Sequence, residues 1–247
     1  MNFNIRGCFA ELIATFALVF VGSLSVTASV VIFELSGPNY PVSILLIGLS
    51  HGLIISLMIY SIGHVSGGHI NPAVTISMIV CKKIGVADGV GYIIFQLIGA
   101  LIGAGTHALL LPIGATVKYG LNTPGSFHGE VFSDGTVFGI EFLLTFMLVF
   151  VIFGTAVSGR APPGWAGFAI GMTVALGHFI GVSISGASMN PARTFGPAVI
   201  SWTQGLEGAF QVHHIYWIAP ILGGLVAAGI YKYVFMSSKE RNSQFSS

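Results

Sequence analysis

Two short loops in this chain have nearly the same sequence, and each interrupts a long apolar stretch. The first loop, at 66–73, is Ser-Gly-Gly-His-Ile-Asn-Pro-Ala, and the second, at 185–192, is Ser-Gly-Ala-Ser-Met-Asn-Pro-Ala. Both are too polar and too rich in small residues to face lipid. Irregular backbone at membrane depth is tolerated only where it is buried in protein or lines a water-filled cavity. The duplication therefore predicts a pore built from two related halves.

The composition is that of an integral membrane protein. Hydrophobic residues make up 54% of the 247 residues and charged residues only 7%, whereas an average soluble domain is about 25% charged. We therefore expect a lipid bilayer around the chain. With so few charges there is no basic patch to bind phosphates, and no nucleic-acid partner is expected. The two cysteines, Cys8 and Cys81, both fall near expected cytoplasmic ends, so no disulfide framework is predicted.

Six apolar stretches are long enough to cross a membrane as helices of about 20 residues. They cover residues 8–33, 41–63, 88–111, 136–157, 164–183 and 213–236. Two shorter apolar segments, 71–80 and 190–200, each begin at Asn-Pro and are too short to span. We interpret them as re-entrant half-helices. The pattern predicts an all-α membrane protein with one structural domain.

The same order of segments occurs twice: a span with a glutamate, a second span, an Asn-Pro loop and a third span. Residues 11–20 and 141–150 agree at six of ten positions. Because each copy has three spans, an odd number, the second copy is inverted, and such repeats place their site near the midplane. The expected halves are residues 1–120 and 121–236, followed by a flexible cytoplasmic tail at 237–247.

Basic residues predict the orientation of the bundle. With six spans, seven of the nine fall on one side: Arg6, Lys82, Lys83, Arg160, Lys232, Lys239 and Arg241. Lys118 falls on the other side, and Arg193 lies inside the second loop. Because cytoplasmic loops carry an excess of Lys and Arg, both termini are expected in the cytoplasm. A plasma membrane is the default expectation, and an intracellular membrane is the alternative.

Each Asn-Pro-Ala triplet has the chemistry of a helix start. Asn is a favoured N-cap and Pro is tolerated at the first helical position. The motif residues are Asn71, Pro72, Ala73, Asn190, Pro191 and Ala192. A helix N-terminus carries about half a positive elementary charge, so two facing ends repel cations, protons included, while the Asn amides donate to a passing molecule. Backbone carbonyls are expected to line the path at Gly67, Gly68, His69, Gly186, Ala187 and Ser188.

These loops, the second of which continues as Asn-Pro-Ala-Arg, resemble those of the aquaporin (major intrinsic protein) family, and the resemblance covers residues 8–236. It implies an aquaporin-like fold of six transmembrane helices and two re-entrant half-helices in an inverted repeat. It also implies a homotetramer with one pore per subunit and passive flow of water or small neutral solutes. No cofactor, metal or chemical step is expected.

The resemblance implies roles for further residues. By spacing from the two Asn residues, the family's outer constriction falls at His51, His178, Ala187 and Arg193. Its apolar pore wall falls at Leu18, Ile55, Leu148 and Val174. Carboxylates inside spans are costly, and in the family they hold the polar loops by hydrogen bonds. These are Glu11 and Glu141, each expected at the cytoplasmic end of its repeat copy.

The identity of the permeant is less determined than the channel class. A His at 178 facing an Arg favours water over glycerol. His51 stands where orthodox water channels have Phe and where tonoplast-type and ammonia-permeable members have His. Ammonia is therefore a possible permeant in addition to water. Ala187 offers no thiol, so weak block by mercury is expected. Two interpretations from other classes are a junctional or adhesion protein with a vestigial pore and a membrane-embedded enzyme using Glu11, Glu141 or the histidines.

Overall fold

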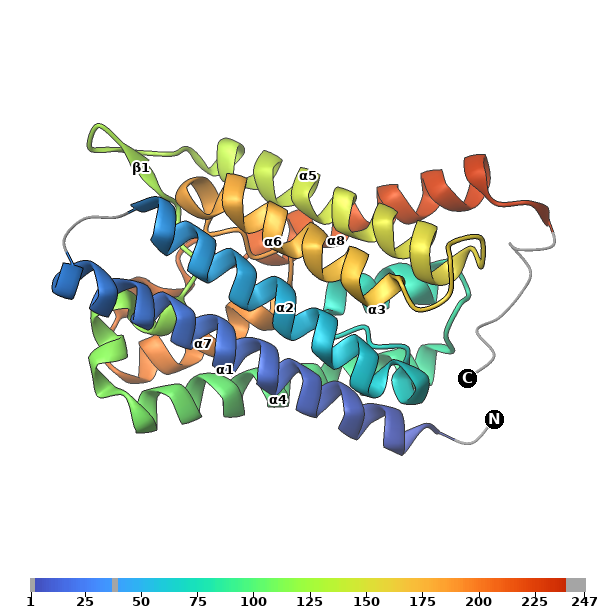
Figure 1. Ribbon diagram of the computed structural model, residues 1–247, viewed down its shortest axis with the longest axis horizontal. Coiled ribbons are helices and arrows are strands. Elements are labelled where there is room, and N and C mark those ends of the chain that lie inside the picture. The colour runs from blue at the N-terminus through green and yellow to red at the C-terminus, as the bar shows by residue number, and fades with distance from the viewer. Residues whose placement is uncertain (1–2, 37–39, 239–247) are drawn as a thin grey trace.

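The computed structural model describes residues 3–36 and 40–238, and these form a bundle of six long helices around two short ones (Figure 1). The long helices are α1 (Ile5–Ser36), α2 (Tyr40–Ser66), α4 (Val86–Leu110), α5 (Asp134–Ile152), α6 (Ala166–Ser185) and α8 (Ile215–Ile230). Within the described residues, six helical segments are long and apolar enough to cross a membrane. The six predicted spans are confirmed.

The two short helices begin at the predicted Asn-Pro pairs. They are α3 (Pro72–Val80) and α7 (Pro191–Thr203), with Asn71 and Asn190 as N-caps. Both Asn residues have extended backbone, and their side chains accept hydrogen bonds from the first turn of the helix that follows. The predicted helix starts are therefore confirmed. In Figure 1, α3 and α7 lie toward opposite ends of the bundle.

The helix α7 is longer than the predicted segment 190–200. It continues to Thr203 and ends near Gly205, which has a φ of +93°. The amide of Gly205 donates to the carbonyl of Trp202 at 3.0 Å. Because glycine is favoured in the left-handed region just past a helix, the stop signal lies at Gly205, beyond the end of the apolar run.

The connections between the long helices contain elements that the apolar pattern does not predict. Between α4 and α5 lie η1 (Pro112–Gly120) and an antiparallel hairpin of β1 (Ser126–Phe127) and β2 (Glu130–Val131). The π-helical turns η2 (Phe153–Val157) and η4 (Tyr231–Phe235) extend α5 and α8, and η3 (Glu207–Phe210) precedes α8. The segment η1 packs against α1, α4 and α7, which brings it close to the second Asn-Pro loop.

Corresponding helix pairs pack in the same way in the two halves. The helix α1 packs against α4 and α2, and α5 packs against α8 and α6. Gly99 of α4 lies against the backbone of Leu12 in α1, and Gly223 of α8 lies against the backbone of Phe142 in α5. Because glycine has no side chain, it lets two helix backbones approach closely. The same close crossing therefore occurs in each half.

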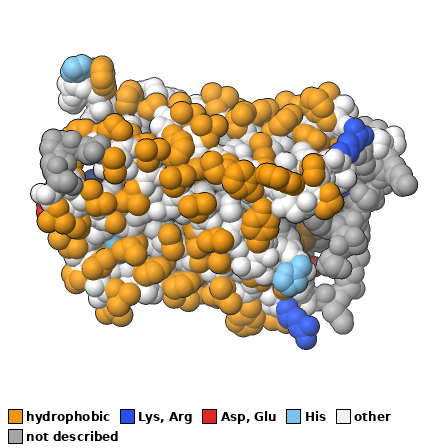
Figure 2. Space-filling view, in the orientation of Figure 1, with side chains coloured by type: hydrophobic (Ala, Val, Ile, Leu, Met, Phe, Trp, Pro, Cys, Tyr) orange, Lys and Arg blue, Asp and Glu red, His pale blue; other side chains and the backbone are white. Residues whose placement is uncertain are grey.

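The outside of the bundle is apolar along the helices. Large hydrophobic side chains such as Leu53, Leu57 and Leu176 are half exposed or more. In Figure 2, hydrophobic atoms cover the middle of the visible face, while Lys and Arg atoms are prominent at its right-hand end. Helices satisfy their backbone groups internally, as lipid requires. The fold is that of an integral, multi-pass membrane protein.

The opposite directions of the two halves correct one expectation. In Figure 1, α1 begins at the right-hand end of the bundle, and α5 begins at the left-hand end. Glu11 and Glu141 are both near the starts of their helices, so they lie toward opposite ends. The expectation that both lie at the cytoplasmic end is wrong, because inversion of the second copy reverses its direction across the membrane.

Candidate pore and selectivity filter

A cavity with about 740 Å³ of empty space, which includes space open to solvent, runs into the bundle. Its wall is formed by residues of α1, α2, α3, α5, α6 and α7 and of both Asn-Pro loops. The structure brings these predicted site residues together around it: Leu18, His51, Ile55, Gly67, Gly68, His69, Asn71, Leu148, Val174, His178, Ser188, Asn190 and Arg193.

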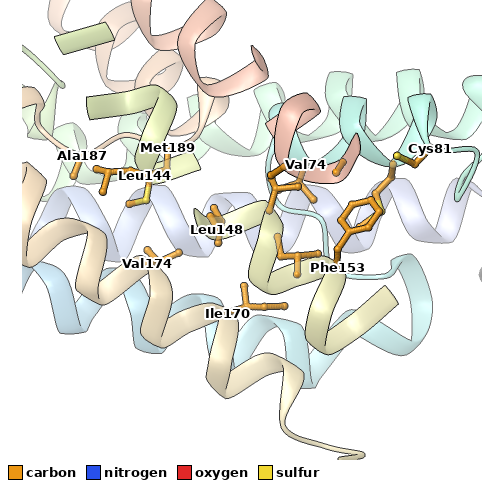
Figure 3. Close-up of a cluster of buried hydrophobic side chains, with 14 of the residues drawn as sticks. Val74, Cys81, Leu144, Leu148, Phe153, Ile170, Val174, Ala187 and Met189 are labelled. Atoms are coloured by element: carbon orange, nitrogen blue, oxygen red, sulfur yellow. The ribbon is translucent and has the colours of Figure 1, made fainter. Parts of the chain in front are cut away.

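Much of the cavity wall is apolar. Leu148 of α5, Ile170 and Val174 of α6 and Val74 of α3 belong to one cluster of buried side chains (Figure 3). Leu18 of α1 lies in a second buried cluster, and it also lines the cavity. Fast passage requires that binding be weak enough for release. A wall of this kind offers a polar molecule few hydrogen bonds and so does not hold it.

The two Asn-Pro loops are joined by reciprocal hydrogen bonds. The side-chain amide of Asn71 donates to the carbonyl of Met189 at 2.7 Å, and that of Asn190 donates to the carbonyl of Ile70 at 2.9 Å. Ile70 and Met189 each precede their Asn and have left-handed backbone, with φ of +58° and +53°. The N-termini of α3 and α7 are thereby held tip to tip beside the cavity.

These contacts fix the orientation of both amide groups. The oxygen of Asn71 accepts from the N–H of Ala73 at 2.8 Å, and the oxygen of Asn190 accepts from that of Ala192 at 3.0 Å. Each amide NH₂ has two hydrogens. One of them bonds the opposite loop, and the other is left for the cavity that both side chains line. The cavity therefore has two N–H donors beside two positive helix ends.

Buried carboxylates hold each loop from behind. For Glu141, the donors are Ser185 Oγ at 2.7 Å, Ser188 N at 2.8 Å and Met189 N at 2.7 Å. For Glu11, the donors are Ser66 Oγ at 2.6 Å, His69 N at 2.8 Å, Ile70 N at 2.5 Å and the Gln96 amide at 2.8 Å. Both carboxylates are fully buried. Because hydrogen bonds to an ionised group are strong, they fix the shape of the loops.

Two histidines and Arg193 come together at the cavity wall. His51 Nδ1 lies 2.8 Å from the carbonyl of Ile47, and His178 Nδ1 lies 2.9 Å from that of Val174. The two rings stack with centroids 4.1 Å apart. Because a carbonyl only accepts, each Nδ1 carries the hydrogen, and the Nε2 of each neutral ring is an acceptor.

Only one of the two Nε2 acceptors has a hydrogen-bond partner among the described residues. His51 Nε2 accepts from Arg193 Nε at 3.3 Å and lies 3.2 Å from Arg193 Nη2. His178 Nε2 is buried and has no hydrogen-bond partner in the part of the chain that the structure describes. His178 lines the cavity beside Arg193, and its Nε2 is an acceptor that no described group uses.

Asn122 holds Arg193 from the loop that follows η1, and the sequence analysis did not single it out. Its side-chain oxygen accepts from Arg193 Nη1 and, at 2.8 Å, from the hydroxyl of Thr194. Its amide donates to the carbonyl of Gly186 at 2.8 Å, and the carbonyl of Gly120 also accepts from Arg193 Nη1, at 2.6 Å. These partners of Asn122 are 64 to 72 residues away, so no local signal marks it.

Some predicted residues lie behind the cavity wall. Gly186 and Ala187 are not among the residues that line the cavity, and the carbonyl of Gly186 is bonded by Asn122. Ala187 is fully buried and faces Gly181. The remaining motif residues are buried in the first turns of the half-helices: Pro72, Ala73, Pro191 and Ala192.

Two further residues that were not predicted as site residues are Ile70 and Met189, whose carbonyls receive the Asn side chains. Both are apolar, and nothing in their side chains marks them. Their position before each Asn-Pro is repeated in both loops, however, so the duplication is a signal that could have found them.

Together, an apolar helical bundle and two half-helices that meet beside an internal cavity define a multi-pass membrane protein with a central polar site. Residues 1–231 match the Major intrinsic protein family. The chain therefore belongs to the major intrinsic protein, or aquaporin, family, as the resemblance of the loops indicated. Members of this family are channels and not enzymes, which removes the interpretation as a membrane-embedded enzyme.

Relatives and a solved structure agree with this assignment. Aquaporin-4 of Bos taurus is 44% identical over 83% of this chain and 61% of its own length, so this chain spans about three-fifths of that relative. Aquaporin-5 of Sus scrofa is 37% identical over 93% of this chain and 81% of its own length. The X-ray structure of the aquaglyceroporin from Plasmodium falciparum is similar with a TM-score of 0.81 and 22% identity, covering 94% of this chain and 96% of that one. It shares the fold.

Proposed function

We propose that this chain is a passive water channel that excludes ions and protons. The observation that carries the proposal is the pair of reciprocal hydrogen bonds, Asn71 to Met189 and Asn190 to Ile70, beside the central cavity. They hold two helix N-termini against each other, and each end carries about half a positive charge. Cations are repelled there, while the two Asn amides donate to the oxygen of a neutral molecule.

Single-file flow of water follows from the chemistry of the wall. Water bonds the Asn donors and the unpaired Nε2 of His178, and it meets mostly apolar side chains between these points. Selection by pore diameter, lining hydrogen bonds and a positive barrier is characteristic of water-type channels. Osmotic gradients drive the flow.

A pair of matched variants tests the path. Leu148→Trp adds bulk to a cavity-lining position of α5, whereas Leu143→Trp adds the same bulk on the outer face of the same helix, where Leu143 is 57% exposed. In proteoliposomes, Leu148→Trp is expected to remove most of the water permeability and Leu143→Trp to preserve it. Equal permeability of the two variants would mean that water does not use this cavity.

Ammonia is a second candidate permeant, and the filter histidines favour it. Ammonia donates N–H bonds as water donates O–H bonds, so the unpaired acceptor of His178 suits both. His51 accepts from Arg193 beside the cavity. In His51→Phe this acceptor is lost, and a larger apolar ring takes its place beside Arg193. We expect lower ammonia flux, measured by alkalinisation of the vesicle lumen, while an unchanged flux counts against ammonia as a permeant.

We also propose a homotetramer with one pore per subunit and an inverted repeat with halves at 1–120 and 121–236. In this proposal the protein lies in the plasma membrane or in an intracellular membrane, and both of its termini are in the cytoplasm. Lys239, Arg241 and the tail beyond 238 lie outside the described residues. Epitope tags at both ends, stained before and after permeabilisation, test the orientation, and staining of either tag on intact cells overturns it. A junctional protein with a vestigial pore predicts no water flux at all.

A further inference from the structure

His107 and Thr27 form a buried polar pair that does not line the cavity. His107 lies in the last turn of α4, is fully buried, and has its Nε2 2.9 Å from the hydroxyl of Thr27 in α1. The Nδ1 of His107 is buried and has no hydrogen-bond partner among the described residues. A buried polar group costs free energy unless it is bonded. The unpaired Nδ1 of His107 therefore destabilises the fold unless the imidazole has a structural role elsewhere.

The imidazole of His107 supports the segment η1. The ring of Tyr119 stands edge-on to it, with centroids 5.6 Å apart and planes at 87°. Gly114 is so close that an added Cβ would lie 2.8 Å from His107 Nε2 and 2.9 Å from Tyr119 Cδ1. Thr27, Gly114 and Tyr119 thus enclose the imidazole. The position of the imidazole therefore determines how η1 packs against α1 and α4.

The end of η1 has an unfavourable backbone conformation. Lys118, Tyr119 and Gly120 have φ of +51°, +51° and +75°. Residues other than glycine adopt this left-handed region at a cost, and such strain persists only where the surrounding structure holds it. The carbonyl of Lys118 accepts from the hydroxyl of Ser201 at 2.8 Å, and the ring of Tyr119 is held against His107.

This strained segment carries one of the acceptors of Arg193. The carbonyl of Gly120, the residue after Tyr119, accepts from Arg193 Nη1 at 2.6 Å. Arg193 lines the cavity. We propose that His107 is a positioning residue that acts through Tyr119 and the Gly120 carbonyl to fix Arg193 at the cavity wall, and so sets how well the channel excludes solutes larger than water. This inference rests on the proposed function and deepens it.

Permeability measurements in proteoliposomes at matched protein density test the proposal. His107→Leu removes both ring nitrogens, and we expect the ratio of glycerol to water permeability to rise about five-fold, the effect of losing one modest contact. His107→Gln keeps a group that can bond Thr27 and is expected to restore most of the wild-type ratio. His64→Leu makes the same substitution at an exposed position at the end of α2 and should leave the ratio unchanged.

A second variant and a second measurement keep the proposal testable if His107→Leu does not fold. Thr27→Val removes the partner of His107 with little change of shape. Hydrogen–deuterium exchange over residues 112–122 reports on η1 without any flux, and we expect it to become faster in His107→Leu and in Thr27→Val. Unchanged exchange and an unchanged ratio in a folded variant overturn the proposal, as does a His107→Gln ratio as high as that of His107→Leu. If wild-type vesicles pass no water while exchange still becomes faster, the proposed function fails and the hold of His107 on η1 stands.

Discussion

Glu11 and Glu141 are fully buried acids, and an ionised carboxylate away from water needs full compensation. Each receives that compensation from its own loop: a serine hydroxyl and two consecutive backbone N–H groups just before the Asn-Pro pair. The carboxylates therefore act on the pore indirectly, by fixing the turn that aims each Asn.

Replacement of one carboxylate by an amide tests this role. In Glu141→Gln, the new NH₂ group faces N–H donors, so hydrogen bonds to Ser188 or Met189 are lost. We expect the midpoint of thermal unfolding in detergent to fall by about 5 °C or more, given the cost of unsatisfied buried donors. The control is Glu130→Gln on the exposed strand β2. Equal midpoints for the two variants would contradict a loop-holding role.

Asn122 connects Arg193 to the second loop, and its loss should loosen the filter. In Asn122→Ala, both Arg193 and Thr194 lose an acceptor and the carbonyl of Gly186 loses a donor. We expect the ratio of glycerol to water permeability in proteoliposomes to rise about five-fold. Asn122→Asp keeps an oxygen toward Arg193 and should stay nearer the wild type. A wild-type ratio in Asn122→Ala would show that Gly120 and His51 suffice to hold Arg193.

Mercury sensitivity depends on the two cysteines. Cys8 and Cys81 are both buried, and burial raises the pKa of the Cys81 thiol. The thiolate is the reactive form, so little of it is present near neutral pH. We expect mercuric chloride to leave most of the water permeability intact. Strong block that disappears in Cys81→Ser would contradict this and would show that a distant cysteine controls the pore.

The residues that sequence alone identifies are those whose role depends on local chemistry. Asn71 and Asn190 are followed by Pro, and an N-cap is a local interaction that any Asn-Pro favours. Asn122 follows an ordinary loop residue and precedes Thr-Pro, and its partners lie in α7 and the second loop. Such a role depends on the folded chain, so one sequence without relatives does not reveal it.

Among the elements, helix crossings depend on glycines that are placed where backbones meet. A Cβ on Gly99 would overlap the backbone of α1 at Leu12, and nothing lies within 4 Å of the Cβ position of Gly229. We therefore expect Gly99→Ala to lower the free energy of unfolding by about 1–3 kcal/mol, as overpacking does. Gly229→Ala should have no such effect. Thermal unfolding of the two variants in one detergent measures the difference, and equal stability refutes the close crossing.

The long helices and half-helices could be predicted from apolar length and Asn-Pro, whereas the connecting elements could not. The π-helical turns η2 and η4 lie beside each other, with the ring centroids of Phe153 and Tyr231 6.2 Å apart. The left-handed residues of η1 are held by α4 and α7. Tertiary contacts of this kind override local preference, so the apolar pattern contains no signal for them.

For the molecule as a whole, inversion of the second half brings two ordinary helix starts together beside one cavity. An isolated Asn-capped helix has one positive end. Two copies in opposite orientations have their positive ends joined through Met189 and Ile70, with His51, His178 and Arg193 around the same cavity. The family match covers residues 1–231 and so includes both halves.

The most direct test of the account is the osmotic water permeability of proteoliposomes that contain the wild-type chain, recorded by stopped-flow light scattering against an impermeant osmolyte. A pH-sensitive dye in the lumen follows proton leakage in the same vesicles. If the chain is a water channel that excludes protons, its water permeability will be well above that of empty vesicles and its proton leakage equal to theirs. Water permeability equal to that of empty vesicles would contradict a water channel.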